Sequence, residues 1–372
     1  MVEAYPGSVD VFVAGGGPAG LATAIAARRH GLSVLVADGA VPPIDKPCGE
    51  GLMPDGVEAL RQLGVSIPDG EAFPFRGIRF LSDGRTAEAT FPFGTAYGIR
   101  RTNLHRIMVE HAAECGVSML WQAVVSGLHP EGALISGNLV RARWIVGADG
   151  STSRIRQWAG LDDHLQMQQR FAFRRHYQVE PWTDFMALHW GRGCQLYVTP
   201  VSREEICVAL ISSTPKLRLE DALGQFPELA ARLRQAAHAS TERGAITVSR
   251  RLRRVYRNRI VLVGDASGGV DAITGEGLCL AFRQAAVLAD CLTAEDLSRY
   301  QTEHRKLARR PAFMARMMLL MARQSFIRER AMRAFTSSPG LFARMLAMHV
   351  GDGSPRDYVS HSLALGWNFL KA

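Results

Sequence analysis

The sequence predicts an α/β fold: a doubly wound, Rossmann-like domain, an antiparallel β-sheet domain and a helical C-terminus. Three observations support this prediction. A strand, a glycine-rich turn, a helix and a second strand follow one another over residues 9–38, which is the order of a dinucleotide-binding βαβ unit. Segments of period two that are rich in aromatic side chains begin at Phe171. Helical patterns dominate beyond Arg299.

The composition indicates a globular protein of two domains. The chain has 372 residues, of which 47% are hydrophobic, and can bury a large core. Residues 1–8 lack the basic and apolar regions of a signal peptide, and no charge-free apolar run reaches the length of a membrane span, so we expect a cytoplasmic protein. The six cysteines form no C-x-x-C pair, so neither a disulfide framework nor a metal site is indicated.

The net charge of +9 comes from one end of the chain. Residues 1–298 carry 31 basic and 31 acidic side chains, whereas residues 299–372 carry 13 and 4. Such asymmetry favours an acidic partner or an anionic surface over a general affinity for nucleic acid.

The turn after the first strand has G-x-G-x-x-G spacing. Glycines at these positions let the backbone turn sharply and approach a pyrophosphate, which lies on the positive N-terminus of the following helix. Asp38 ends the second strand, where a carboxylate can accept hydrogen bonds from a ribose diol. We therefore predict a dinucleotide site built by Gly15, Gly17, Pro18, Ala19, Gly20 and Asp38.

Residues 41–54 contain four prolines and two glycines and are expected to form a loop at the sheet edge where ligands bind. The segment Asp45-Lys-Pro-Cys-Gly-Glu-Gly51 resembles the loop of geranylgeranyl reductase-like flavoproteins. These belong to the wider class of FAD enzymes that includes p-hydroxybenzoate hydroxylase-type monooxygenases. The resemblance implies that Cys48 and Gly49 lie near the flavin ring. Cys48 is a candidate catalytic thiol, with plain packing as the alternative role.

The next segments continue the pattern. Residues 77–93 predict a hairpin of the second sheet that turns at Ser82-Asp-Gly-Arg85. In the resembled class, an arginine at the start of the following helix contacts FAD, and Arg101 is the better match of the two arginines there. Further elements are expected as a helix from Arg100 to about Cys115 and as strands over 117–125 and 139–146.

The segment Gly147-Ala-Asp-Gly-Ser-Thr-Ser-Arg-Ile-Arg156 matches the G-A-D-G-x-x-S-x-V-R pattern of FAD monooxygenases and their reductase relatives. A strand is expected to end here in a tight turn that exposes Asp149 before a helix that starts near Ser151. The resemblance implies that Asp149 and Gly150 contact FAD. In hydroxylases this stretch also accommodates a nicotinamide cofactor.

Residues 171–213 predict an antiparallel sheet that covers the flavin and forms the substrate chamber. An arginine or histidine that faces an apolar pocket can orient an acidic or phenolic substrate. The candidate substrate residues, for which a solvated strand position is the alternative, are Arg174, His176, His189 and Tyr197. Residues 217–238 are expected to be helical, and residues 245–256 to return as a strand.

The segment 258–278 holds the last motif. A buried strand over Ile260–Val263 leads to Asp265, and the turn Thr274-Gly-Glu-Gly277 precedes a helix from Leu278 to Leu292. In the resembled class, the aspartate binds the FAD ribose, and the helix start points N–H groups at the flavin N1–C2=O edge, where they stabilise negative charge. The resemblance thus assigns FAD contacts, with Gly275 and Gly277 at the reacting edge, to Gly264, Asp265, Gly275, Glu276, Gly277 and Leu278.

Beyond Arg299 we expect helices, with Pro311 in a first helical turn. Arg316, Arg323 and Arg330 recur at intervals of seven, which predicts that they share one helix face. Such a face can dock on the protein's own domain, on a membrane surface or on an acidic carrier protein.

Together the motifs predict three regions. The FAD-binding domain comprises residues 1–75, 94–170 and 256–298, the substrate domain 76–93 and 171–255, and the helical C-terminal region 299–372. We expect an FAD-dependent oxidoreductase with NAD(P)H as electron donor and a hydrophobic small molecule as substrate. We expect the protein in the cytoplasm, where it could also associate peripherally with a membrane.

Several reactions fit this fold. The first hypothesis is a monooxygenase; the alternative is a geranylgeranyl reductase-like enzyme that reduces C=C bonds of an isoprenoid or polyketide-type lipid. The Cys-Gly-Glu-Gly and Thr-Gly-Glu-Gly loops favour the reductase, but Tyr197-Val-Thr-Pro-Val201 departs from its Tyr-x-Trp-x-Phe-Pro pattern. Gly264-Asp-Ala-Ser-Gly268 departs from the Gly-Asp-Ala-Ala-His stretch of hydroxylases. A halogenase lacks support because no Trp-x-Trp-x-Ile-Pro segment is found, and a non-catalytic flavin-binding adaptor would leave the flavin-edge motif without purpose.

Overall fold

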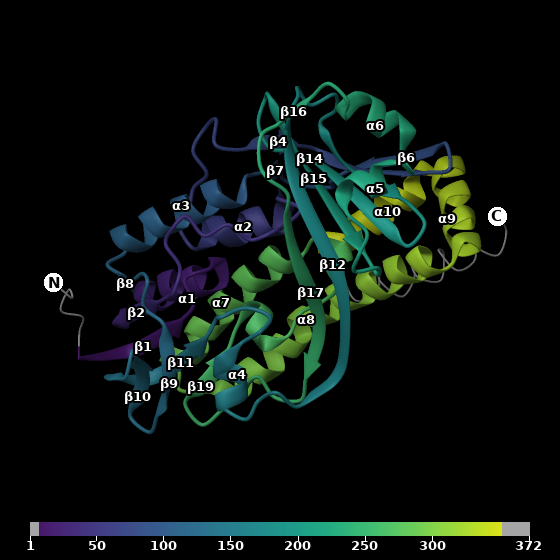
Figure 1. The fold of residues 1–372 in the computed structure, drawn as a ribbon. Helices are drawn as coiled ribbons and strands as arrows, with labels where there is room; N and C mark the ends of the chain where they lie inside the picture. Colours follow the sequence, from purple (N-terminus) through teal and green to yellow (C-terminus); the bar gives the residue numbers. More distant parts are fainter. Residues whose placement is uncertain (1–6, 352–372) are drawn as a thin grey trace.

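The computed structural model describes residues 7–351 and contains two large β-sheets (Figure 1). The first sheet and its helices lie at the left of Figure 1, the second sheet lies at its upper centre, and the long helix α8 runs along the lower side. Residues 352–372, which are part of the predicted C-terminal region, lie outside the described residues.

The first sheet forms the dinucleotide-binding part. β1 lies near its middle and pairs in parallel with both β2 and β11. Side chains alternate along β1, so that Val11 and Val13 enter one core cluster while Phe12 and Ala14 enter another. In spatial order the main strands are β18 (Tyr256–Arg257), β19 (Ile260–Leu262), β11 (Asn138–Gly147), β1 (Ser8–Ala14), β2 (Val34–Ala37) and β8 (Ser118–Leu120).

Each face of the first sheet is covered by different elements. The cluster that contains Val11 also contains Leu21, Met108 and Phe282 from three helices. The cluster that contains Phe12 is closed instead by a hairpin and a short helix. The three helices are α1 (Pro18–Arg29), α3 (Arg101–Glu114) and α7 (Gly277–Thr293); the other face carries β9 (Val125–His129), β10 (Gly132–Ile135) and α4 (Arg154–Trp158).

The second sheet is antiparallel except where β13 and β5 pair in parallel. The predicted hairpin at Ser82–Arg85 is confirmed, because β5 and β6 pair on either side of that turn. In spatial order the strands are β16 (Ala237–His238), β12 (His164–Gln178), β15 (Glu205–Ser212), β14 (Cys194–Pro200), β13 (Phe185–Trp190), β5 (Gly77–Ser82) and β6 (Arg85–Thr90), with β17 (Arg243–Leu252) also on β12. A small third sheet and a helix near it are β3 (Gly51–Leu52), β7 (Ala96–Gly98), β4 (Phe73–Phe75) and α2 (Pro54–Gln62).

The C-terminal helices pack on the second sheet. The ring of Phe342 lies 4.8 Å from that of Phe80 and 5.0 Å from that of Phe335, measured between centroids. These aromatic contacts join the helices to β5 in a continuous core. The helices are α8 (Leu297–Arg323), α9 (Ser325–Ser337) and α10 (Pro339–His349).

Two predictions about helices in the middle of the chain are wrong. Residues 217–238 do not form one helix but two short ones, α5 (Leu219–Leu223) and α6 (Pro227–Leu233), because Pro227 begins a new helix. The helix after the Asp-Gly motif begins at Arg154 rather than near Ser151. Its N-cap is Ser153, whose side chain accepts a hydrogen bond from the Arg156 N–H.

Two predictions about the C-terminal helices are also wrong. Pro311 lies inside α8, which already begins at Leu297. The three arginines do not share a face, because α8 ends at Arg323 and Arg330 belongs to α9. The backbone of Gln324 between the helices is extended, with φ −119° and ψ 101°.

The close packing of the turn after β1 yields a prediction on stability. A Cβ atom on Gly20 would lie 1.9 Å from the Gly15 carbonyl oxygen, whereas one on Gly17 would meet no atom within 4 Å. Gly20→Ala should therefore lower the free energy of unfolding by about 1–3 kcal/mol, the usual range for overpacking. Gly17→Ala is the matched control. Denaturant titration of both cofactor-free variants checks this, and equal stability would contradict the packing argument.

Candidate active site

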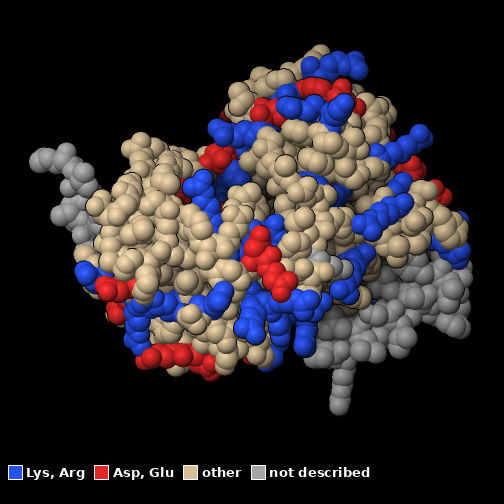
Figure 2. Space-filling model, turned by 60° about the horizontal axis from the view of Figure 1, so that its bottom comes forward, with Lys and Arg blue, Asp and Glu red and all other residues tan. Residues whose placement is uncertain are grey.

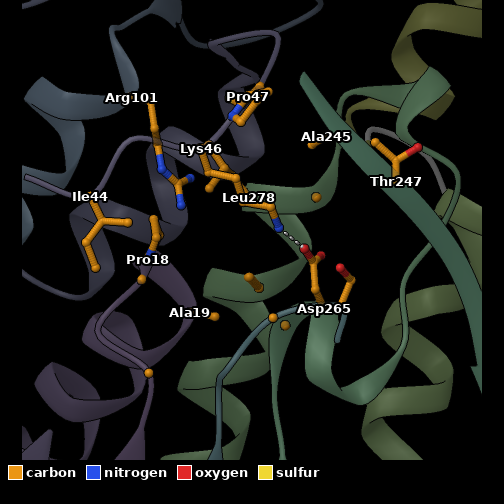
Figure 3. Close-up of a pocket in the computed structure, with 18 of the residues that line it drawn as sticks. Pro18, Ala19, Ile44, Lys46, Pro47, Arg101, Ala245, Thr247, Asp265 and Leu278 are labelled. Carbon is orange, nitrogen blue, oxygen red and sulfur yellow. Dashed lines mark hydrogen bonds and ion pairs between the residues drawn. The ribbon is translucent and has the colours of Figure 1, made fainter. Parts of the chain in front are cut away.

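A cavity of about 700 Å³ lies between the first sheet's turns and the second sheet (Figure 3). It is lined by the turn after β1, the loop of residues 38–50, the start of α7 and strands β12, β15 and β17. Of the predicted cofactor residues, Gly20 and Glu276 do not line it. Those that do are Gly15, Gly17, Pro18, Ala19, Asp38, Cys48, Gly49, Arg101, Asp149, Gly150, Gly264, Asp265, Gly275, Gly277 and Leu278.

The glycine-rich turn has two kinds of glycine. Gly15 has φ +111°, and a Cβ there would lie 2.5 Å from the Ala148 carbonyl oxygen, so Gly15 and Gly20 serve backbone packing. Gly17 has an ordinary φ of −73° and open space where a side chain would be. Asp38 holds this turn, because its carboxylate accepts hydrogen bonds from the Gly16 N–H (2.7 Å) and the Ala40 N–H (2.8 Å).

Asp265 is placed by a short 3₁₀ helix, Gly264–Ser267, directly after β19. Its Oδ2 atom forms an ion pair with Lys46 Nζ at 2.7 Å, which Figure 3 marks with a dashed line. The Lys46 charge lowers the pKa of Asp265. Asp265 is therefore an anion that faces the cavity.

Arg101 begins α3 and is a buried cation on the cavity wall. In Figure 3 its guanidinium points toward the space between Lys46 and Pro18. Its Nε atom is buried and has no hydrogen-bond partner among the described residues. A buried donor without a partner costs free energy, so this position suits an acceptor group of a ligand.

The turn before α7 exposes backbone rather than side chains to the cavity. Gly275 has φ +69°, a left-handed conformation that favours glycine. The Glu276 side chain turns away from the cavity, toward Arg310 (Oε1–Nη2 3.1 Å) and His349 (Oε2–Nδ1 3.6 Å). Burial raises the pKa of Glu276. The backbone of Gly275, Gly277 and Leu278 is thus what a flavin would meet.

Asp149 organises the turn after β11. Its carboxylate accepts hydrogen bonds from Ser153 Oγ and from the backbone N–H groups of Arg154 (2.7 Å) and Ile155 (3.1 Å). It therefore caps the start of α4 while it also lines the cavity. Gly150, with φ +81°, lies at the apex of the turn.

The loop that carries Cys48 is tied to the second sheet. Thr199 Oγ1 donates a hydrogen bond to the Gly49 carbonyl (2.8 Å), and the Glu50 N–H donates to Cys48 Sγ (3.1 Å). Burial raises the pKa of the Cys48 thiol. Cys48 is therefore held as a protonated thiol at the cavity wall rather than as a reactive thiolate.

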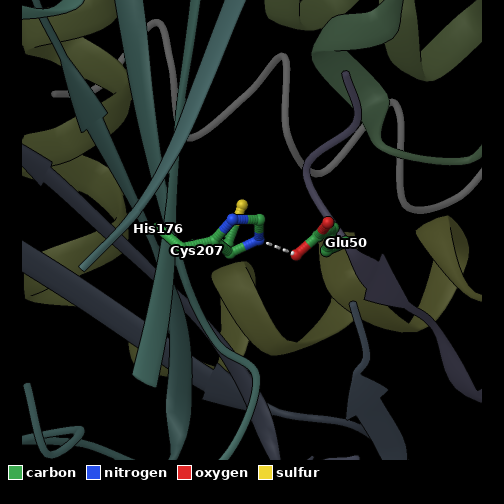
Figure 4. A group of neighbouring side chains, drawn as sticks. All are labelled: Glu50, His176 and Cys207. Atoms are coloured by element: carbon green, nitrogen blue, oxygen red, sulfur yellow. Dashed lines mark hydrogen bonds and ion pairs between the residues drawn. The ribbon is translucent and has the colours of Figure 1, made fainter. Parts of the chain in front are cut away.

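Behind this loop, Glu50, His176 and Cys207 lie buried side by side (Figure 4). His176 Nε2 lies 2.6 Å from Glu50 Oε2, while its Nδ1 lies 3.0 Å from nitrogens of both Arg100 and Arg174. Guanidinium nitrogens only donate, so Nδ1 accepts and Nε2 carries the proton that is donated to Glu50. A metal on Nε2 would require a proton on Nδ1, facing two guanidinium groups. These three residues, which we call the Glu50–His176–Cys207 cluster, therefore connect the loop to the second sheet.

The four predicted substrate residues separate into two groups. Arg174 and Tyr197 line the cavity. His176 does not line it, because it belongs to the Glu50–His176–Cys207 cluster. His189 does not line it either, and its ring centroid lies 5.8 Å from that of Phe226. Burial lowers the pKa of His189 to about 4, so it is neutral.

Sequence reasoning missed three residues that shape the site. Lys46 and Glu50 belong to the loop motif, where charged residues in a proline- and glycine-rich segment were a usable signal. His304, from α8, had no local signal. Its Nε2 lies 2.8 Å from Ser267 Oγ, and that hydroxyl donates to the Gly264 carbonyl, so His304 supports the 3₁₀ turn that carries Asp265.

The doubly wound sheet, its glycine turn and the cavity beside the second sheet are those of a dinucleotide-binding flavoprotein. Residues 8–299 match the family described as FAD binding domain, and the chain belongs to that family. It is an FAD-dependent oxidoreductase. Within residues 7–351, no helix combines the length and apolarity that crossing a membrane requires.

Curated relatives include both reductases and a hydroxylase. The chain is 29% identical over 321 residues to menaquinone reductase of Mycobacterium tuberculosis (strain ATCC 25618 / H37Rv), covering 78% of each chain. It is 30% identical over 328 residues to digeranylgeranylglycerophospholipid reductase 1 of Methanopyrus kandleri, covering 78% of this chain and 84% of the relative. It is 26% identical over 311 residues to ubiquinone hydroxylase UbiM of Neisseria meningitidis, covering 75% and 68%.

Solved structures share the fold. A flavoprotein/dehydrogenase from Cytophaga hutchinsonii has a TM-score of 0.79 at 19% identity, over 92% of this chain and 93% of that one. The flavin-dependent brominase Bmp2 has a TM-score of 0.75 at 19% identity, over 98% and 100%. A 2-methyl-3-hydroxypyridine-5-carboxylic acid oxygenase has a TM-score of 0.72 at 22% identity, over 85% and 93%.

The residues of the cavity fit FAD. Open space at Gly17 and the N–H groups at the start of α1 suit a pyrophosphate. The partnerless Nε of Arg101 suits an acceptor on the cofactor, and the start of α7 suits the electron-rich edge of a flavin. Asp38 and Asp265 would hold ribose and ribityl hydroxyls.

The open space at Gly17 predicts a selective loss of cofactor. In Gly17→Val the branched side chain would occupy the position of the pyrophosphate, so the FAD content after purification should fall by at least about tenfold. Stability of the cofactor-free form should change little. Flavin absorbance and a melting curve of the apoprotein measure the two effects. Full FAD content in Gly17→Val would contradict the assignment.

His304 predicts an acid sensitivity. Burial lowers its pKa from 6.5 to about 4, so the folded state keeps it neutral while the unfolded state binds a proton between these values. Its contribution to stability is present above pH 6.5 and is lost as the pH falls toward 4. His304→Gln can still donate to Ser267 but does not titrate. Between pH 6.5 and 4 the native protein should lose about 3 kcal/mol more than this variant; parallel pH profiles of unfolding would contradict the assignment.

Proposed function

We propose that this chain is an FAD-dependent reductase that saturates a C=C bond of an isoprenoid-type lipid, with electrons from NAD(P)H. The observation that carries this proposal is the wall that the second sheet gives to the cavity. Its apolar side chains include Ala172, Met186 and Ile211 from three strands of that sheet. An apolar chain is the ligand that such a wall suits.

The polar groups on this wall are engaged by the protein except for Arg174 Nε, which has no hydrogen-bond partner among the described residues and lies 3.9 Å from Glu50 Oε1. Arg174 pairs with Asp45 and lies 3.0 Å from His176, and the Tyr197 hydroxyl donates to the Ile273 carbonyl at 2.6 Å. An acidic or phenolic substrate would need free partners of this kind. Their engagement favours a substrate that lacks charge near the reacting bond.

The rim of the cavity carries large apolar side chains beside the exposed Thr152, Arg154 and Asp265. Trp158 and Ile246 line the cavity and yet are 40% and 52% exposed. Large exposed apolar side chains at a cavity mouth are typical of sites that admit an apolar partner. Two curated relatives, menaquinone reductase and digeranylgeranylglycerophospholipid reductase, are named as reductases of isoprenoid lipids and support an apolar lipid as substrate.

Saturation of a C=C bond adds a hydride and a proton. FAD, when bound, supplies the two-electron chemistry. The chain would supply position and the proton: Arg101 and the N–H groups at the start of α7 would hold the cofactor edge, and Cys48 holds a proton on Sγ at the cavity wall. The apolar sheet excludes water from the reacting bond.

The reaction type can be tested with one preparation. FAD-loaded protein, photoreduced without oxygen, is mixed with a detergent-dispersed geranylgeranyl lipid, and flavin absorbance and product mass are followed. We expect reoxidation with a product that has gained two hydrogens. Cys48→Ala should slow this step by about 10²-fold or more if its proton is used, with FAD retained. Cys291→Ala, which changes a buried cysteine of α7 outside the cavity lining, is the matched control.

A monooxygenase is the second candidate. The ubiquinone hydroxylase among the curated relatives favours it, and the Asp149–Gly150 turn, which lines the cavity, belongs to the motif that accommodates a nicotinamide in the resembled hydroxylases. The same preparation separates the two reactions. Reoxidation only after oxygen is admitted, with a product that has gained one oxygen, would overturn the reductase and establish the hydroxylase.

A lipid substrate also implies a place of action. We propose that the protein is cytoplasmic and associates peripherally with a membrane, from which its substrate reaches the cavity. The basic C-terminal region supports this location, because basic surface attracts anionic lipid.

A further inference from the structure

The side of α8 that faces solvent combines arginines with large apolar side chains. Six residues, at positions 305, 309, 313, 316, 320 and 323, lie within an arc of about 80° around this helix, because each residue turns the helix by about 100°. All six are exposed, Phe313 by 44% and Leu320 by 48%. We call this surface the outer face of α8; it consists of Arg305, Arg309, Phe313, Arg316, Leu320 and Arg323.

The charge of this face is of one sign. The acidic residue of α8 is Glu303, which lies about 160° from Arg305 around the helix and pairs with Lys306. Within residues 7–351, Arg309, Arg316 and Arg323 have no ion-pair partner. Figure 2 shows Lys and Arg side chains gathered on the lower side of the molecule, along which α8 runs in Figure 1.

The outer face continues toward the mouth of the cavity. Arg305 donates a hydrogen bond to the Arg253 carbonyl (2.9 Å), directly after the end of β17. Next to that end of β17, the paired strand β12 exposes Leu165 by 45% and Met167 by 49%. The same two strands carry cavity-lining residues further along. Basic and apolar side chains, together with Asp163, which pairs with Arg253, therefore lie between α8 and the strands that wall the cavity.

We propose that the outer face of α8 binds an anionic membrane surface, with Phe313 and Leu320 entering the headgroup boundary and the arginines contacting lipid phosphates. Single apolar side chains between cations are typical of helices that lie on lipid. On the next helix, α9, Phe326 lies three residues after Arg323 and is 61% exposed. The inference deepens the proposed function by naming the surface that presents a lipid to the cavity, but binding itself does not require the proposed reaction.

Vesicle co-sedimentation tests the proposal. Full-length FAD-loaded protein is mixed with vesicles of phosphatidylcholine alone or with a third of phosphatidylglycerol. We expect binding to the anionic vesicles only, and weaker binding as salt rises. The triple variant Arg309→Gln, Arg316→Gln, Arg323→Gln should weaken this binding by about a hundredfold, since each basic residue near the surface contributes roughly a tenfold factor or less.

Two further variants make the result specific. Arg85→Gln, Arg192→Gln, Arg203→Gln removes the same charge from exposed positions of the second sheet and its loops and should bind like the native protein. Phe313→Ser with Leu320→Ser should weaken binding while its salt dependence remains. Equal loss in both arginine triples, or no binding of native protein to anionic vesicles, would overturn the proposal.

The outcome is separable from that of the reaction. Melting curves of all variants establish that they fold. Turnover of a detergent-dispersed lipid should be unchanged in the α8 triple, because the arginines do not line the cavity. Lost vesicle binding with intact turnover supports the surface, whereas intact vesicle binding in a protein without reductase activity contradicts the proposed function alone.

Discussion

The cavity depends on how one short loop is held between two sheets by opposite charges. Asp45 pairs with two arginines of the second sheet, whereas its neighbour Lys46 pairs with Asp265 after the first sheet. Glu50, held at φ +59°, reaches His176 in the second sheet. Moving the loop would separate charges that are partly or fully buried, which is costly. The loop is thus a fixed wall through which both sheets share one site.

The sequence predicts those parts of the site in which the backbone conformation of a short segment determines the residue type. The turn of Gly15 and Gly20 must be glycine because backbone atoms fill the space of a Cβ, and that demand shows as spacing in the sequence. The turn before α7 shows the same, since Gly275 is left-handed. Strand and helix periodicity placed most elements around these turns.

The parts that the sequence does not predict depend on partners far along the chain. Whether His176 faces the cavity or Glu50 is decided by a loop more than a hundred residues earlier. Glu276 turns from the flavin edge because Arg310 and His349 lie behind it. The prediction that Arg316, Arg323 and Arg330 share one helix face is wrong for another reason. The helix ends at Gln324 without a glycine or a proline, so the sequence gives no sign that the seven-residue spacing spans two helices.

Helix α8 connects the cavity to the proposed membrane-binding surface. Its inner side holds both turns that face the cofactor, since His304 contacts Ser267 and Arg310 pairs with Glu276. The Tyr300 hydroxyl also donates to the Leu262 carbonyl at the end of β19. Because these contacts leave the helix little freedom to rotate, its outer face has a fixed direction relative to the cavity mouth. A membrane bound to that face would meet the site in one orientation, which is what the transfer of a lipid from a bilayer to a buried flavin requires.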